Sequence, residues 1–348
     1  MAAEVIDIHT HILPPPDRLP DFAARTGYGG WVRLEEHKPC CARMIRDGAT
    51  FREIESNCWD PAVRLRECRE AGVTMQALST VPVMFSYWAR PRDVLALGQL
   101  LNDHIAEVCA AFPGRFVGLG TVPLQDPQLA CAELERLMGL PGMRGVQIGS
   151  HVGGWNLDEP ALMPFFERCA ELGAAVFVHP WDMMGQEQMP RFWLPWLVGM
   201  PAETSRAVCS MIFGGVLERL ASLRVCFAHG GGSFPHTIGR VAHGFDSRPD
   251  LCAAVNPVNP RAYVRDPDSG APARFYVDSL VHDAEALRYL LHVMGAARVA
   301  LGSDYPFPLG EDPPGRLIRS MHDLTDAVRS RLLSGTAREF LGLDGPRG

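Results

Sequence analysis

Lysine is almost absent from this chain of 348 residues. Of its 33 basic residues only Lys38 is a lysine, and all the others are arginine. Schiff-base and pyridoxal-phosphate chemistry require a lysine in the active site. Lys38 stands in a polar, proline-flanked stretch that we expect to be a surface loop, so these chemistries are set aside.

Other features are missing as well. The ten cysteines contain no Cys-x-x-Cys pair, no apolar stretch approaches the ~20 residues of a membrane span, and the N-terminus has no basic region typical of a signal peptide. The net charge is −7, which argues against nucleic acid as a partner. We therefore expect a cytoplasmic protein with reduced cysteines that binds neither nucleic acid nor a membrane.

Short apolar runs rich in β-branched residues recur along the chain, and helical stretches separate most of them. The strands are expected at residues 4–8, 73–79, 116–121, 144–149, 174–179, 223–229, 274–278 and 298–303. Helices are expected from 60, 91 and 126 and over 159–172, 201–220, 234–243 and 283–295. Alternating strands and helices are typical of a parallel sheet. Eight such units predict an α/β fold, a (β/α)8 TIM barrel, and favour it over an open doubly wound sheet.

The predicted barrel is interrupted after its first strand. Residues 14–60 are rich in proline, glycine and charge, and we expect them to form a small insertion of a few antiparallel strands that covers the barrel mouth. Residues 1–13 and 61–348 then form the metal-dependent barrel. The helical tail after Leu324 is expected to pack on the outside.

Four histidines and one aspartate stand at the ends of predicted strands. They are His9, His11, His179, His229 and Asp304. Barrels of this type carry their active sites at the carboxyl ends of the strands, where these side chains would meet. Three imidazoles and a carboxylate suit a divalent metal, most simply zinc. His229 could be a further ligand or a general acid/base beside the metal.

One metal is favoured over two, because a carbamate-bridged pair needs a lysine at the end of a middle strand and none follows residues 144–149. Two other interpretations are weaker. The three glycines after His229 resemble an esterase oxyanion loop, but no Gly-x-Ser-x-Gly elbow occurs, and a phosphate site there has no other support. Asp278, at the end of the seventh predicted strand, could support a metal ligand or, slightly better, cap a helix.

This arrangement resembles the amidohydrolase superfamily, and especially the decarboxylases within it. The resemblance covers nearly the whole chain. It is carried by the metal set and by the runs at residues 6–14, 27–32, 77–89, 192–204 and 304–311.

The resemblance implies one zinc ion per chain at His9, His11, His179 and Asp304, with His229 as the catalytic residue that activates water. It further implies substrate contacts from six residues, namely Arg52, Arg240, Trp196, Met183, Phe307 and Arg46. Arg46 stands where some relatives have a lysine, which changes the hydrogen-bond geometry. The family's counterpart of Arg240 implies a homodimer in which this arginine enters the neighbouring active site.

The implied reaction is the non-oxidative loss of one carboxylate from a small, doubly anionic enamine semialdehyde of the kynurenine pathway of tryptophan catabolism. Bidentate arginines suit such a substrate. The alternative is a metal-dependent hydrolase of the same superfamily acting on a small carboxylated lactone or amide. A barrel that only binds a ligand is disfavoured, because every metal-ligand position is filled.

Overall fold

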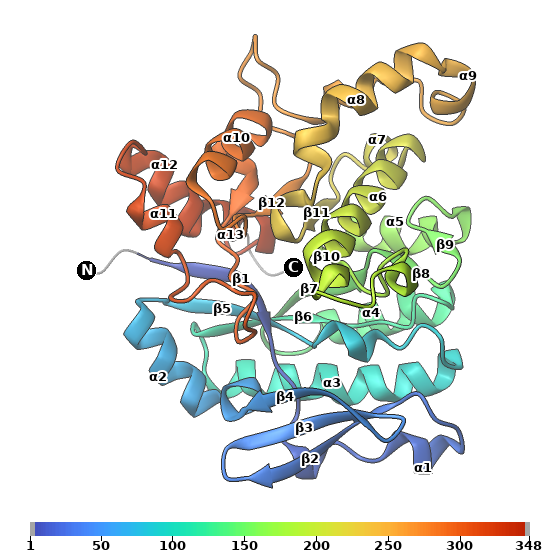
Figure 1. Ribbon diagram of the computed structural model, residues 1–348, viewed down its shortest axis with the longest axis vertical. Coiled ribbons are helices and arrows are strands. Elements are labelled where there is room, and N and C mark those ends of the chain that lie inside the picture. The colour runs from blue at the N-terminus through green and yellow to red at the C-terminus, as the bar shows by residue number, and fades with distance from the viewer. Residues whose placement is uncertain (1–3, 345–348) are drawn as a thin grey trace.

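A parallel sheet of eight strands lies at the centre of the chain, which the computed structural model describes over residues 4–344 (Figure 1). The strands are β1 (Ile6–His11), β5 (Met75–Ser79), β6 (Phe116–Gly120), β7 (Met143–Gly149), β10 (Ala175–His179), β11 (Arg224–Phe227), β12 (Tyr276–Asp278) and β13 (Val299–Ala300). They lie side by side in that order, and each neighbouring pair is parallel. The order follows the sequence, as it does in a barrel built from consecutive strand–helix units.

The last strand returns to the first. The Ile8 amide donates to the Leu301 carbonyl at 2.9 Å, and the His11 amide donates to the Tyr305 carbonyl at 2.8 Å. A parallel bridge joins Thr10 to Tyr305. These contacts close the sheet, so the predicted (β/α)8 barrel is confirmed.

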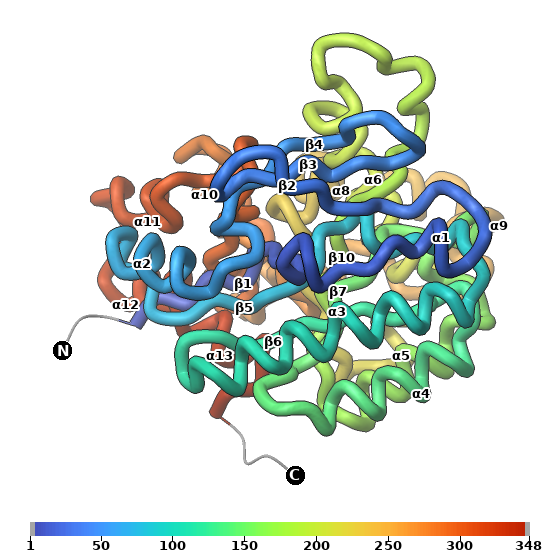
Figure 2. The backbone as a smooth tube through the Cα atoms, turned by 90° about the horizontal axis from the view of Figure 1, so that it is seen from below, coloured from blue at the N-terminus to red at the C-terminus, as the bar shows by residue number. Residues whose placement is uncertain are grey.

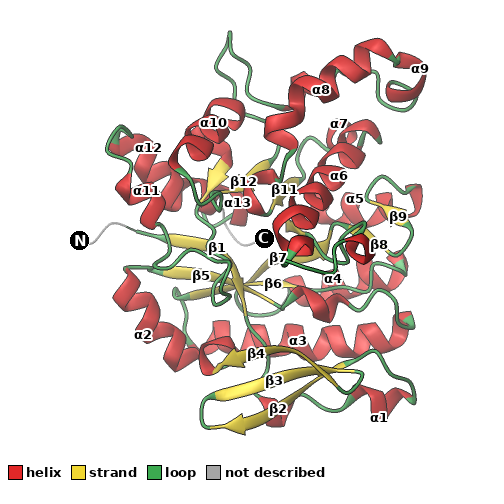
Figure 3. Ribbon diagram, viewed as in Figure 1, coloured by secondary structure: helices red, strands yellow, loops and turns green. Residues whose placement is uncertain are grey.

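Helices surround the sheet (Figure 3). The main ones are α2 (Pro61–Ala71), α3 (Pro91–Ala111), α4 (Pro127–Met138), α5 (Met163–Glu171), α6 (Met200–Phe213), α8 (Phe234–Ser247) and α10 (Ala284–Met294). Asp60 and Asp126 accept backbone N–H groups at the starts of α2 and α4, where a proline occupies the first turn. Proline in the first helical turn loses no intrahelical hydrogen bond, and the aspartate satisfies a free N–H, so the Asp-Pro pairs mark these helix starts as predicted.

The helix expected over residues 201–220 is divided in two. α6 ends before Gly214, and α7 (Val216–Arg219) begins after Gly215, whose φ of 71° is left-handed. Glycine reaches this conformation without a steric penalty, so the chain turns there instead of continuing the helix.

Three antiparallel strands follow β1 and the short α1 (Phe22–Thr26). They are β2 (Val32–Lys38), β3 (Cys41–Arg46) and β4 (Ala49–Glu55), paired in the order β2-β3-β4. Buried side chains of this sheet, such as Leu34 and Met44, share an apolar cluster with Leu97 and Leu101 of α3. Figure 2 shows β3 and β4 beside the projecting loop between β10 and α6. The sheet is thus anchored on the barrel and reaches its carboxyl-terminal rim.

The C-terminal segment contains α9 (Pro249–Cys252) in the loop after α8, then α11 (Arg316–Ser320), α12 (Asp326–Ser330) and α13 (Thr336–Leu341) after β13. Phe340 and Leu341 are fully buried in a cluster with strand residues such as Phe177 and Cys226. The expectation that the tail packs on the outside is confirmed for α12, which has no buried residue, and is wrong for α13, whose apolar side chains pack against residues inside the barrel. No helix among residues 4–344 has the length and hydropathy needed to cross a bilayer.

Candidate metal centre

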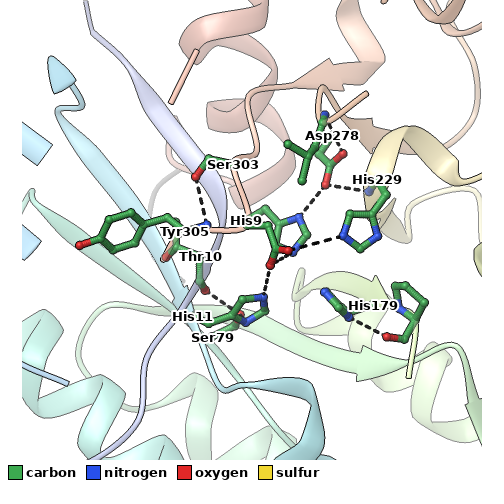
Figure 4. Close-up of polar contacts among 12 residues, drawn as sticks. His9, Thr10, His11, Ser79, His179, His229, Asp278, Ser303 and Tyr305 are labelled. Atoms are coloured by element: carbon green, nitrogen blue, oxygen red, sulfur yellow. Dashed lines mark hydrogen bonds and ion pairs between the residues drawn. The ribbon is translucent and has the colours of Figure 1, made fainter. Parts of the chain in front are cut away.

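The four histidines of the predicted metal site meet at one rim of the barrel (Figure 4). Asp304 joins them there, since its carboxylate lies within 4.0 Å of His9, His11 and His229. His9 and His11 lie in the second half of β1, His179 ends β10, His229 stands two residues after β11, and Asp304 follows β13. The ring centroids of His9 and His179 are 5.1 Å apart, as are those of His179 and His229. Parallel strands end on the same side of a barrel, so residues almost 300 positions apart become neighbours.

Four of these residues form a compact group. One potential ligand atom from each of His9, His179, His229 and Asp304 lies within 4.8 Å of the other three. His11 is the nearest neighbour of this group, and its Nε2 lies 3.0 Å from Oδ1 of Asp304. The geometry therefore brings His229 into the same group of potential ligand atoms as His9, His179 and Asp304.

The orientation of the rings fits a bound cation. Nδ1 of His11 faces the Thr80 carbonyl at 2.9 Å, and Nδ1 of His179 faces the Pro180 carbonyl at 2.9 Å. A carbonyl can only accept, so both Nδ1 atoms carry hydrogen and both Nε2 atoms keep a lone pair. Nε2 of His9 and of His179 are buried without a hydrogen-bond partner among the described residues.

The contact between His11 and Asp304 leads to the same conclusion. With its proton on Nδ1, the imidazole of His11 presents a lone pair to an anionic oxygen at 3.0 Å. Two acceptors so close repel unless a proton or a metal cation lies between them. Unpartnered buried nitrogens and this acceptor pair fit a divalent metal cation.

The protonation states of most of these residues suit metal binding. His9 is the exception, because burial would lower its pKa but the hydrogen bond with Asp278 and the charge of Asp304 raise it. Burial, and then the neighbouring His9, lower the pKa of His179 well below its ordinary value and the pKa of His229 to about 4. Burial by itself would raise the pKa of Asp304, but the close imidazoles of His11, His9 and His229 hold it far below the ordinary range. Neutral imidazoles and an ionised carboxylate are the forms that ligate metals.

Asp278 supports the metal site from below. One of its oxygens lies 2.7 Å from Nδ1 of His9, and both oxygens accept backbone N–H groups around His229. The interpretation of Asp278 as a helix cap is wrong, because α10 begins at Ala284 and Asp283 caps it. The local sequence does not indicate which of Asp278 and Asp283 points into the barrel and which caps α10.

Two further supports of His11 were missed by sequence reasoning. Gln147 of β7 donates to the Thr80 carbonyl at 2.8 Å and accepts from the Ser79 hydroxyl at 2.7 Å. Arg64 of α2 is fully buried and donates to the His11 carbonyl at 2.7 Å. Gln147 stands at the strand end where a carbamate-bridged pair would require lysine, whereas nothing in the local pattern of α2 distinguishes Arg64.

A cavity opens beside the metal group. It is lined by His11, Phe51, Arg52, Val81, Pro82, His179, Trp181, Trp193, Trp196, Met200, Asp304, Phe307, Pro308 and Leu309. The guanidinium of Arg52 lies 4.2 Å from the centroid of the Phe307 ring, and no carboxylate among residues 4–344 forms an ion pair with it. The cavity thus combines an apolar wall with one positive charge.

The other predicted substrate contacts lie farther out. Met183 is buried beside Gly199 and does not line the cavity. Arg46 of β3 lies near Asp182, where its charge opposes the rise in pKa that burial causes at that carboxyl. Arg240 lies exposed on α8 and reaches no cavity of its own chain that contains the metal group.

His229 borders a second cavity of about 290 Å³. Its other walls include Trp196, Leu197, His236 and Leu280. This mainly apolar cavity shares Trp196, Met200 and Leu309 with the cavity beside the metal group.

Comparisons with known proteins agree with this geometry. The model of the amidohydrolase family matches residues 6–343. The chain is 58% identical to the 2-amino-3-carboxymuconate-6-semialdehyde decarboxylase of Dictyostelium discoideum, over 97% of this chain and 92% of that protein. It is 38% identical to the enzyme of that name from Caenorhabditis elegans, over 97% and 94% of the two chains. The 5-carboxyvanillate decarboxylase of Novosphingobium aromaticivorans, complexed with manganese, shares the fold with a TM-score of 0.78 at 20% identity, covering 98% of this chain and 96% of that one.

Proposed function

The chain belongs to the amidohydrolase family, and on that premise we propose that it catalyses the zinc-dependent, non-oxidative decarboxylation of 2-amino-3-carboxymuconate 6-semialdehyde to 2-aminomuconate 6-semialdehyde. This reaction belongs to the kynurenine pathway of tryptophan catabolism. One observation carries the proposal: the unpaired guanidinium of Arg52 lies on the same cavity as the metal group. A substrate with two carboxylates supplies the anion that this cation lacks.

The metal would be held by His9, His11, His179 and Asp304, and a ligand set rich in imidazole suits zinc. When bound, zinc supplies Lewis-acid polarisation and lowers the pKa of water beside it. A related decarboxylase holds manganese, so the metal content of the purified protein decides between the two ions.

The residues of the chain account for the remaining steps. Arg52 binds a substrate carboxylate, and the aromatic wall formed by Trp196 and Phe307 excludes water. Breaking the bond to the second carboxylate releases CO2 and leaves its electron pair in the conjugated enamine. The carbon must then take up a proton, and we assign its transfer to Nε2 of His229, which lies 4.0 Å from Oδ2 of Asp304. The named decarboxylases among the relatives favour this reaction over hydrolysis of a lactone or amide.

The first experiment mixes the zinc-loaded protein with the semialdehyde and follows its absorbance together with released CO2. We expect one CO2 for each substrate consumed, and consumption without CO2 would contradict the proposal. His229→Ala should keep its zinc and lose turnover by on the order of 10²-fold or more. Loss of zinc in that variant would make His229 a ligand, as its place in the compact group allows.

The assembly is a further part of the proposal: a homodimer in which Arg240 enters the neighbouring active site. The support is the exposed position of Arg240 on α8 and the second cavity that opens next to His229. An apolar side chain of the second cavity is also exposed, since Leu197 is 49% accessible. Exposed apolar groups of this kind are typical of a surface that a partner covers.

Mixing two inactive variants tests the assembly. A heterodimer of Arg240→Ala and His229→Ala contains one complete site if Arg240 acts across the interface, so activity should return once subunits have exchanged. No recovery after verified exchange would place Arg240 in its own chain. Arg248→Ala serves as a control, because Arg248 is exposed at the far end of the same helix and pairs with Asp250.

The insertion and the cellular location complete the proposal. We propose that residues 14–60 form a unit over the barrel mouth, since Phe51 and Arg52 of β4 line the cavity. Arg46 would attract the anionic substrate at the cavity edge, and Met183 would support its wall. The cysteines of the described chain are all free, which supports a cytoplasmic location.

A further inference from the structure

Asp278 receives four hydrogen bonds although it is completely buried. Its Oδ2 faces Nδ1 of His9 at 2.7 Å and the amide of His229 at 3.0 Å. Its Oδ1 faces the amides of Gly230 at 2.8 Å and Leu280 at 3.1 Å. The three amides can only donate, so both oxygens must act as acceptors.

The contact with His9 determines which nitrogen of that ring can bind a metal. A carboxylate oxygen that already accepts an amide accepts the proton on Nδ1 as well, so Nε2 of His9 keeps its lone pair. This Nε2 is buried without a hydrogen-bond partner and lies 3.4 Å from Oδ1 of Asp304. Asp278 therefore directs the ligating atom of His9 toward the metal group.

The contact with the loop after β11 determines the position of His229. The backbone of His229 has a φ of 55°, and the next residue, Gly230, has a φ of 63°. Successive residues in this left-handed region turn their N–H groups to one side and form a cradle for an anion. Asp278 occupies that cradle, so the same carboxylate holds the backbone from which His229 reaches the site (Figure 4).

The surrounding space leaves no alternative to aspartate. A Cβ at Gly302 would lie 2.7 Å from the Cβ of Asp278 and 2.8 Å from the Cβ of His9, so the backbone closes over the pair. An asparagine has only one acceptor oxygen, and its NH2 group would face two donors.

We propose that Asp278 is a positioning residue that joins the metal ligand His9 to the proton-transfer residue His229 through a single carboxylate. The inference rests on the proposed metal site and extends it to a residue that contacts neither metal nor substrate. It predicts that exchanging one atom in Asp278, to give Asp278→Asn, weakens metal binding although the side chain keeps its size. Loss of a partner that orients a ligand typically costs 10–100-fold in metal affinity.

The matched control is Glu133→Gln. Glu133 is also buried and accepts from Asn102 at 2.7 Å and from Gln99 at 3.1 Å, but it lies on α4, away from the strand ends. A general effect of replacing a buried carboxylate by an amide would appear in both variants. An effect through His9 would appear only in Asp278→Asn.

The experiment titrates each metal-free protein with zinc against a coloured chelator and records the visible spectrum of the cobalt form. We expect an affinity 10–100-fold lower and an altered cobalt spectrum for Asp278→Asn, with Glu133→Gln equal to the unmodified protein. Equal affinity and an unchanged spectrum in Asp278→Asn would overturn the inference. Because zinc alone is the probe, a protein that binds zinc in this way but leaves the semialdehyde intact would refute the proposed function and not this inference.

A second measurement needs no Asp278 variant to fold. The nitrogen NMR spectrum of the metal-free protein labelled in histidine, with His9 identified through a His9→Gln sample, reports which ring nitrogen carries the proton. We expect hydrogen on Nδ1 of His9. A proton on Nε2 alone would show that Asp278 does not orient the ring.

Discussion

Arg52 is a partly buried cation without an anionic partner, so removing its charge should affect stability and catalysis in opposite directions. Burial lowers the pKa of Arg52, which shows that its surroundings disfavour the charged form, and the attraction of Asp304 only partly offsets this. Arg52→Met keeps an apolar stem of similar length. Arg52→Lys keeps the charge but loses the planar fork.

The magnitudes follow from its two environments. In the free protein, Arg52→Met removes an unpaired charge but also the guanidinium that stacks 4.2 Å from the Phe307 centroid. That stacking contributes ~0.5–2 kcal/mol, and a methionine sulfur beside the ring restores ~0.3–1.5 kcal/mol. Relief of the desolvation cost then leaves a net stabilisation of about 1 kcal/mol.

With substrate bound, the balance reverses. A hydrogen bond to a charged group contributes ~1.5–3 kcal/mol, so loss of the pairing with a substrate carboxylate should lower kcat/KM on the order of 10²-fold in Arg52→Met. Arg52→Lys retains the attraction but not the bidentate geometry and should lose roughly 10-fold. Steady-state kinetics measure the catalytic change, and urea unfolding of the zinc-loaded proteins measures the change in stability.

Arg43→Met is the control, because Arg43 is exposed on β3 of the same sheet. It should leave both quantities unchanged within about 0.5 kcal/mol. The reasoning would be refuted if Arg52→Met kept full kcat/KM, or if it unfolded more easily than the unmodified protein while Arg43→Met did not.

Three further predictions concern the metal, the pH dependence and the sheet. His9→Ala and Asp304→Ala should each lose zinc and turnover together while keeping the circular dichroism of the folded barrel, and a variant with full zinc and full turnover would refute the ligand assignment. Burial lowers the pKa of His104 from 6.5 to about 4, so the unfolded chain binds a proton in this window that the folded chain does not. The free energy of unfolding should therefore fall as the pH drops from 6.5 to 4, by at most roughly 3 kcal/mol. Urea unfolding at several pH values should show a weaker dependence of this free energy on pH in His104→Leu. A Cβ at Gly145 would lie 1.9 Å from a carbonyl oxygen of β10, whereas a Cβ at Gly154 meets nothing within 4 Å. Gly145→Ala should lower the free energy of unfolding on the order of 3 kcal/mol and Gly154→Ala hardly at all, and similar losses in both would contradict this account of the strand contact.

Local patterns predicted the architecture well. The run expected over residues 174–179 is β10, from Ala175 to His179, and the Asp-Pro pair at residues 60–61 starts α2 where a cap and a proline require it. These features depend on residues within a few positions of one another, so their physical cause is visible in the sequence. The number and alternation of the units then predict the barrel, and with it the meeting of His9, His179 and Asp304 at one rim.

The contacts that the local patterns missed join residues that are far apart in the sequence. The register of β1 shifts between Asp7 and Thr10, and the ring of His9 faces Asp278, which is 269 residues away. Arg64 reaches the carbonyl of His11 across 53 residues. The periodicity of apolar residues predicts which side of a strand or helix is buried. It does not predict which residue of another element a buried polar side chain contacts.

By itself, the sequence determined the order of strands and helices, the rim on which the polar strand ends gather, and the residue types available there. These follow from the alternation of apolar runs and from the short-range capping of helices. Only the tertiary structure decided that Asp283 and not Asp278 caps α10, that α13 packs against residues inside the barrel, and that Arg52 has no carboxylate partner within residues 4–344. Each of these results depends on close packing between segments distant in the chain, where a shift of a few ångströms changes the partner of a buried polar group.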